Sequence, residues 1–289
     1  MKENEEIEFL EILGFLFKNK FKLLFVSFSL GFIFFIYSLF LPNIFVSESK
    51  LKVVDNEMSR QIEASNLGIF NVFQQSQSQR GYLQDHIESR DFFKRVSENT
   101  NIVILLLGYE KIENKSEDEI RGLLNSKSLK EKHSKKLSQI DFLTQHSVFK
   151  SSFEVDLASG PFTLRTFHTN PTLTKILIEQ IVKETNSYFK DKDDRESSEA
   201  IKYISEELPK NNLIDVQATL NNVLSAKIRT LVLSNIKTDY VLEYIDSPFI
   251  PLSISLPSRD LYLYSGMLIG FFLTAFWLLS RRYLFKKSE

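Results

Sequence analysis

The sequence contains no cysteine and only nine glycines among its 289 residues. The lack of cysteine excludes a disulfide framework and a thiolate metal site, and it leaves the redox compartment open. None of the glycines is followed by lysine, so no phosphate-binding G-x-x-x-x-G-K-[ST] loop occurs, and G-x-G-x-x-G and G-x-S-x-G are absent too. The chain therefore lacks the short glycine motifs of nucleotide-binding proteins and of α/β-hydrolases.

The four histidines are also too scattered for H-E-x-x-H or any short-spaced metal pair; they are His86, His133, His146 and His168. We interpret His168 as a surface or packing residue. Acidic side chains are plentiful, but the sequence singles out no catalytic pair. We therefore expect no catalytic residue, no cofactor-binding residue and no metal site, and nothing favours an enzyme.

Charge of either sign is in balance, with 36 basic and 37 acidic residues and a formal net charge of −1. Without a basic domain, nothing indicates a nucleic-acid partner. What the chain does contain is apolar residues gathered at its two ends, and 26 phenylalanines.

Two long runs carry no charge at all: residues 23–41, LLFVSFSLGFIFFIYSLFL, and residues 261–279, LYLYSGMLIGFFLTAFWLL. About 20 such residues, each rising about 1.5 Å, cross the ~30 Å hydrocarbon core of a bilayer. A buried core helix is the alternative for either run. A cleaved signal peptide is the alternative for the first, but its apolar core would be shorter, about 7–15 residues, and it would end in small residues rather than in FLPNIF. We predict two transmembrane helices.

Basic residues flank both runs on the side away from the centre of the chain: Lys18, Lys20 and Lys22, and then Arg281, Arg282, Lys286 and Lys287. Positive flanks stay in the cytoplasm. We therefore expect a cytoplasmic amphipathic N-terminus (residues 1–22), a periplasmic domain (42–260) and a cytoplasmic tail (280–289). The protein would lie in a bacterial inner membrane.

The first part of the central domain mixes short elements. Residues 44–54 alternate as a strand does, and residues 82–99 repeat apolar side chains at helical spacing. Residues 101–108, NIVILLLG, predict a short apolar strand or buried segment. Two short helices are expected near 116–124 and 128–143.

The second part begins with a hairpin, in which two alternating runs flank the turn at residues 158–161. Asn170 and Pro171 then predict the N-cap and first position of a long helix over about 171–208. Pro209 interrupts it, and a second amphipathic helix over about 212–237 leads to a strand at 240–246.

Within the first long helix, residues 190–199, KDKDDRESSE, are polar on all sides, which predicts a solvated stretch, a helix tip or a break in a loop. Strands near the two spans could pair beside the membrane. The expected fold class is α+β: two transmembrane helices flank a periplasmic domain with a small membrane-proximal mixed sheet and long projecting helices.

Two local features lie at the second span. Gly266 and Gly270 form a G-x-x-x-G spacing that lets helix backbones approach closely, although glycine is common in membrane helices generally. Pro248, Pro251 and Pro257 hold the preceding backbone extended and cannot donate to a sheet. They predict a semi-rigid strut before the span, with a plain linker as the alternative.

In this order, these features resemble the Wzz chain-length determinants, the bacterial polysaccharide co-polymerases. The resemblance covers essentially the whole chain. Its motifs are the lead EIEFLEILGFLFKNK, Pro42 with IFVSESKL, the helix HIESRDFFKRV, the segment FTLRTFHTNPTLTKILIEQIV, and the closing IDSPFIPLSISLPSR and SGMLIGFF. Residues 101–150 depart from the pattern.

The resemblance implies a homo-oligomer in the lipid bilayer that catalyses no reaction. It would set the length of O-antigen or a related lipopolysaccharide polymer, as a scaffold for the membrane polysaccharide polymerase, with the growing polysaccharide as a further expected partner. A related branch implies an adaptor for capsule or exopolysaccharide export with a separately encoded tyrosine kinase, since we expect none fused here. An extracytoplasmic sensor is a further alternative, and an enzyme acting on polysaccharide is the third.

Overall fold

The computed structural model describes residues 14–54, 76–113, 115–157, 160–210 and 213–286. The chain divides into two compact units: residues 1–44 with 253–289, and residues 45–252. Residues 1–13 of the predicted amphipathic N-terminus, Ala158 and Ser159 of the predicted turn, and Lys287 lie outside the described residues.

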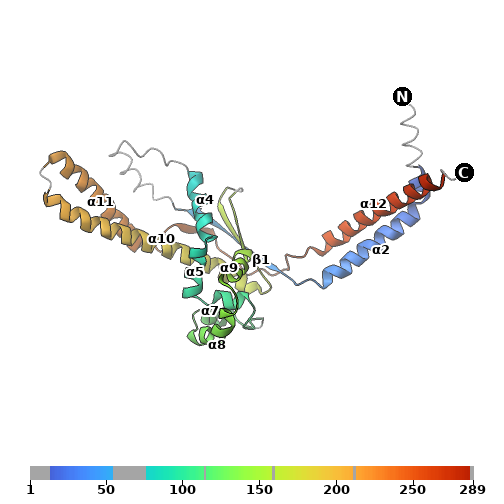
Figure 1. Ribbon diagram of the computed structural model, residues 1–289, viewed down its shortest axis with the longest axis horizontal. Helices are drawn as coiled ribbons and strands as arrows, with labels where there is room; N and C mark the ends of the chain where they lie inside the picture. The colour runs from blue at the N-terminus through green and yellow to red at the C-terminus, as the bar shows by residue number, and fades with distance from the viewer. Residues whose placement is uncertain (1–13, 55–75, 114, 158–159, 211–212, 287–289) are drawn as a thin grey trace, which may run out of the picture. The chain divides into compact units, whose positions relative to one another are not determined.

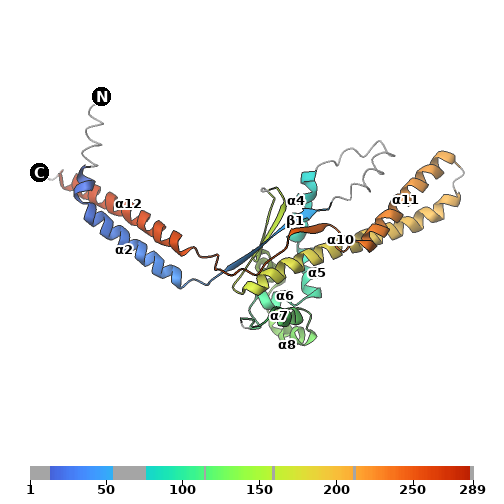
Figure 2. The same ribbon diagram turned by 180° about the vertical axis from the view of Figure 1, so that it is seen from behind.

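The first unit is a pair of long helices, α2 (Lys20–Leu39) and α12 (Arg259–Lys286), which lie side by side in Figures 1 and 2. Residues early in α2 meet residues late in α12, so the two helices run antiparallel. Their 20 and 28 residues correspond to about 30 and 42 Å of helix, enough to cross a bilayer.

The second unit contains a four-stranded sheet in the order β2 (Phe153–Asp156), β3 (Phe162–His168), β1 (Phe45–Val53) and β4 (Leu242–Asp246). Strands β2 and β3 are the predicted hairpin. Every pairing in this sheet is antiparallel, which corrects the expected mixed sheet. The reason is that β4 returns towards the second span while β1 leaves the first, so the two strands run in opposite directions.

Helix α10 (Pro171–Glu207) packs on β1 and β3 and closes the main core. The Asn170 side chain accepts a hydrogen bond from Leu173 N at 3.0 Å, and Pro171 begins the helix. The apolar face of the first turns is fully buried against the sheet and neighbouring helices; its residues are Leu173, Ile176, Leu177, Ile178 and Ile181. With 37 residues, α10 extends about 55 Å.

After the short 3₁₀ turn η2 (Leu208–Lys210), helix α11 (Ile214–Ile236) returns beside α10, as Figures 1 and 2 show. The α+β class with two candidate membrane helices and long helices is thereby confirmed. Ala226 and Ser234 are the fully buried residues of α11 within the described part of the chain.

The remaining helices of this unit are α4 (Ser76–Ile87), α5 (Arg90–Asn99), α6 (Ile102–Leu106), α7 (Glu117–Leu124), α8 (Lys127–Ser138) and α9 (Phe142–Ser151). The helix predicted over residues 82–99 is thus broken in two. Ser89 has extended backbone and its hydroxyl accepts from Phe92 N at 3.1 Å, so it acts as the N-cap of α5.

Of the two alternatives for residues 101–108, the strand is wrong, because residues 102–106 form the helix α6, whereas the buried segment is confirmed. An apolar run without alternation fits a buried helix as well as a buried strand. Ile102, Val103, Ile104 and Leu105 are all buried, and the helix ends before Gly108, whose φ of 67° favours glycine.

The single helix predicted near 128–143 is also wrong, since α8 ends at Ser138 and α9 begins at Phe142. Asp141 between them accepts a hydrogen bond from Leu143 N at 3.1 Å and caps α9. The cap formed by Asp141 therefore begins a new helix within a segment whose apolar spacing suggested a single one.

Candidate functional site

No group of three or more His, Asp or Glu side chains is arranged to hold a metal ion among the described residues. The features that distinguish this molecule are therefore the helix pair and the contacts that shape the central unit.

A seam of small residues joins α2 and α12. A methyl group added to Gly266 would lie 2.8 Å from Gly31 Cα, and one added to Gly270 would lie 2.8 Å from Ser27 Cα. Gly31 and Ser27 are themselves spaced four apart on α2, so each helix contributes two small residues to the contact. The two predicted glycines thus face α2, and their partners Gly31 and Ser27 were missed because the first span contains no G-x-x-x-G.

The outward surface of the same helices is apolar and exposed, and only 22% of each candidate span is buried. The core helix of a soluble protein would be mostly buried. Large side chains cover this surface, among them Phe21, Phe25, Phe28, Phe32, Leu268, Phe272, Phe276 and Trp277. Such a surface is suited to lipid rather than to water.

Basic side chains gather at one end of the helix pair, because α2 starts there and α12 finishes there. Lys18, Lys20, Lys22 and Arg281 are exposed. The Arg282 guanidinium lies 4.8 Å from the centre of the Phe15 ring, which ties the two ends together. Lys286 is the last residue of α12.

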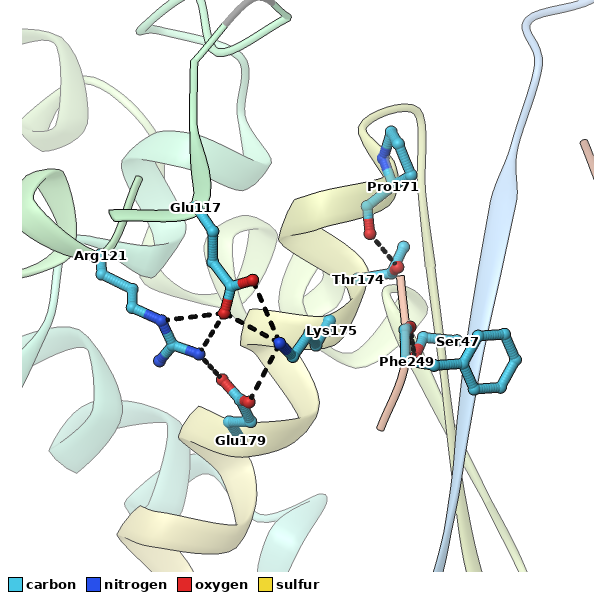
Figure 3. Close-up of polar contacts among 8 residues, drawn as sticks. All are labelled: Ser47, Glu117, Arg121, Pro171, Thr174, Lys175, Glu179 and Phe249. Carbon is cyan, nitrogen blue, oxygen red and sulfur yellow. Dashed lines mark hydrogen bonds and ion pairs between the residues drawn. The ribbon is translucent and has the colours of Figure 1, made fainter. Parts of the chain in front are cut away.

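The segment that contains the three prolines is hydrogen-bonded to neighbouring backbone and side chains. In the central unit, Pro248 and Pro251 are buried, and the chain beside them runs along β1. The Ser47 hydroxyl donates to Phe249 O at 2.7 Å (Figure 3), and the Ser49 hydroxyl donates to Asp246 O at 2.6 Å. Side-chain donors thus hold a backbone whose prolines cannot donate.

In the helix-pair unit, Pro257 is half-buried and follows a short backbone bridge. Ile44 N donates to Leu256 O at 2.9 Å, and Leu256 N donates to Ile44 O at 3.1 Å. The proline-rich segment is therefore hydrogen-bonded within each unit.

The polar stretch 190–199 is part of α10 and neither a tip nor a break, which corrects two of the alternatives left open by the sequence. Its aspartates hold three other segments: Asp191 pairs with Arg95 of α5, Asp193 accepts from the Tyr240 hydroxyl, and Asp194 accepts from the Ser234 hydroxyl.

Two of these partners are deeply buried, with Ser234 at 0% and Tyr240 at 1% exposure. Burial and then the Asp193 carboxylate raise the pKa of Tyr240 well above its usual value, so the phenol stays a donor. These contacts hold the C-terminal end of α11, and the segment that follows it, against α10.

Four charged side chains join α7 to the start of α10 (Figure 3). Lys175 Nζ lies 2.9 Å from Glu117 Oε1, Arg121 bonds Glu117 at 2.6 Å, and Arg121 also pairs with Glu179. Hydrogen bonds from Arg121 and then from Lys175 lower the pKa of Glu117. All four are partly exposed, so this cluster, which we call the ionic quartet, is structural in character.

Histidines lie in packing environments. His86 is 8% exposed, and its ring lies 4.1 Å from the Tyr188 ring, with Phe92 and Phe189 also in contact. Burial, and then nearby Lys192 and Arg95, lower its pKa to about 4. His168 accepts from Asn170 N at 2.9 Å, which agrees with a packing role.

Comparison with known proteins gives a family match in the N-terminal third of the chain. Residues 5–100 match the family model described as Wzz, chain length determinant protein, which confirms the resemblance drawn from the sequence. No curated protein matches.

Solved structures that align with the chain include a full-length bacterial polysaccharide co-polymerase, at 13% identity and a TM-score of 0.36, covering 95% of this chain and 97% of that one. A fragment of WzzB, a polysaccharide co-polymerase from Salmonella Typhimurium, aligns at 13% identity and a TM-score of 0.30, covering 74% of this chain and all of the fragment.

Proposed function

We propose that this chain regulates the chain length of a bacterial surface polysaccharide, O-antigen or a related polymer, because its residues 5–100 match the family model of the Wzz chain length determinants. It acts without catalysis, as an oligomeric scaffold for the polysaccharide polymerase in the inner membrane. The observation that carries the proposal is the family match over residues 5–100, in a chain whose two candidate membrane helices flank one central unit, residues 45–252.

The proposed topology places residues 1–22 and 280–289 in the cytoplasm and residues 42–260 in the periplasm, with spans at 23–41 and 261–279. It is supported by the basic residues at one end of the antiparallel helix pair, because positive flanks are retained in the cytoplasm. The small-residue seam keeps the two spans together as one anchor.

Self-association is supported by α11, which leaves large apolar side chains in water. Ile214 is 82% exposed and Ile236 is 72% exposed, and Ile228 and Val232 are also exposed on this helix. Packing of copies side by side would cover such residues. The resulting assembly would present many identical helical hairpins to the polymerase and to the growing polymer.

Deletion of the encoding gene tests this function. We expect electrophoresis of the surface polysaccharide to show a loss of the preferred length, restored by the parent chain supplied in trans. An unchanged length distribution in every polymer of the organism would refute the proposal.

Because the parent chain has no cysteine, single cysteines can report topology without background. Lys202→Cys, at an exposed site of α10, should react with a membrane-impermeant maleimide added from the periplasmic side, and Lys18→Cys should not. The reverse pattern would refute the orientation.

A further inference from the structure

A pocket of about 340 Å³ opens in the central unit between α10, the end of α11 and β4. Its volume falls in the range of small-molecule sites. The α10 wall includes Lys183, Ser187 and Lys190, and the opposite wall includes Asn235 and the residues that follow α11; Tyr244 of β4 completes it. Apart from Glu179, none of its lining residues belongs to the helix pair or to the ionic quartet.

The walls are held in place by buried hydrogen bonds, so the pocket is preformed. The Asn186 side chain donates to Leu242 O at 2.9 Å and accepts from Val241 N and Leu242 N, both at 2.8 Å. One buried amide thus joins α10 to the segment that follows α11. Tyr240, whose hydroxyl donates to Asp193, also holds this segment against α10.

The pocket carries an excess of positive charge. Lys183, Lys190 and Lys237 line it, and within the described part of the chain their ammonium groups have no hydrogen bond or ion pair. Of the two acidic lining residues, Glu179 is already paired with Arg121. Three lysines therefore face one uncompensated carboxylate, that of Asp239.

The remaining lining groups suit a sugar. The Tyr244 ring offers a flat apolar face, and Thr238 and Asn235 offer neutral polar groups that can bond hydroxyls. Burial, followed by the charges of Glu179 and Asp239, raises the pKa of Tyr244, so its phenol stays protonated and can donate. One aromatic face beside several neutral polar groups and an excess of lysines matches a saccharide that bears an anionic substituent.

We propose that this pocket binds an acidic saccharide unit, a sugar carrying a carboxylate or phosphate, with the three lysines on the anion and Tyr244 beneath the ring. The proposal rests on the proposed function, since it names the part of the polymer that the chain would hold. A pocket on every copy would give an oligomer several contacts with one polymer, and their avidity would exceed the affinity of one site.

The test measures binding by the full chain in nanodiscs of zwitterionic lipid, by calorimetry. The probes are an oligogalacturonate, a neutral oligosaccharide of the same length, and inorganic phosphate. We expect the acidic oligomer to bind, the neutral one to bind at least about 10-fold more weakly, and the affinity to fall as ionic strength rises. Equal binding of the two oligomers, or equally tight binding of phosphate alone, would overturn the proposal.

Variants then locate the site. Lys183→Gln with Lys237→Gln should weaken binding of the acidic oligomer by about 10-fold or more, because two charge-assisted contacts are lost. The matched control is Lys202→Gln, an exposed lysine elsewhere on α10, which should bind as the parent does. Unchanged binding by the double variant would show that the pocket is not the site.

The same double variant separates this inference from the proposed function. If it loses binding but the deletion strain keeps its polymer length, the pocket stands and the function fails. If deletion changes polymer length but no acidic saccharide binds, the function stands and the pocket proposal fails.

Discussion

Gly266→Ala is the smallest change that should separate the two helices of the membrane anchor. The new methyl carbon would lie 2.8 Å from Gly31 Cα and 2.8 Å from Phe34 Cβ, whereas ordinary contacts begin at 3.4 Å, so one helix must move by about 0.6 Å (3.4 − 2.8). Gly31 Cα belongs to the backbone and cannot rotate away. Overpacking of this kind costs about 1–3 kcal/mol.

The matched control is Gly122→Ala in α7, where nothing lies within 4 Å of the added carbon. In a helix, alanine is favoured over glycine by about 0.8–1 kcal/mol, so this variant should be more stable than the parent. The same chemical change thus has opposite signs at the two positions.

Two measurements on the full chain in detergent check this. The first is the thermal unfolding midpoint of each variant. The second is disulfide formation in the pair Leu23→Cys with Ala275→Cys, whose parent residues share one small buried cluster. We expect Gly266→Ala to lower both the midpoint and the cross-linking yield. If Gly266→Ala equals or exceeds the parent in both, the seam is not a close contact and the reasoning fails.

Two further predictions concern the central unit. Because the folded pKa of His86, about 4, lies below its ordinary 6.5, the unfolded state binds more protons as pH falls from 6.5 towards 4, and unfolding becomes easier by up to about 3 kcal/mol across that window. Denaturation of the parent and of His86→Phe at pH 7.5 and pH 5 should show a smaller loss in the variant; an equal loss would contradict this. Glu179→Gln should lower the free energy of unfolding by about 1 kcal/mol at low salt and less at 1 M salt, because its partners are partly exposed. The exposed Glu206→Gln is the control, and an effect that does not change with salt would argue against an ionic contribution.

Much of the fold could be predicted because its signals are local. The uncharged runs define the candidate spans by length alone, and the alternating residues about 158–161 define the hairpin. Asn170 with Pro171 marks the start of α10, since a cap needs only its own first turn.

Residues 101–151 show where such reasoning stops. An unbroken apolar run does not distinguish α6 from a strand, and a cap such as Asp141 is a single polar residue among many. The aspartates of 190–199 likewise look solvated until Ser234 and Tyr240, which are 40 and 47 positions away from their partners, are brought beside them.

By itself, the sequence determined the α+β class, the two candidate spans and the long helices. Hydrophobic periodicity and the length of an uncharged run can each be read within a single segment. Only the tertiary structure decided that Gly31 meets Gly266, that the sheet is antiparallel throughout, and that three lysines share one pocket. Those outcomes depend on which faces of distant segments meet, and a contact between distant segments leaves no repeat in either one.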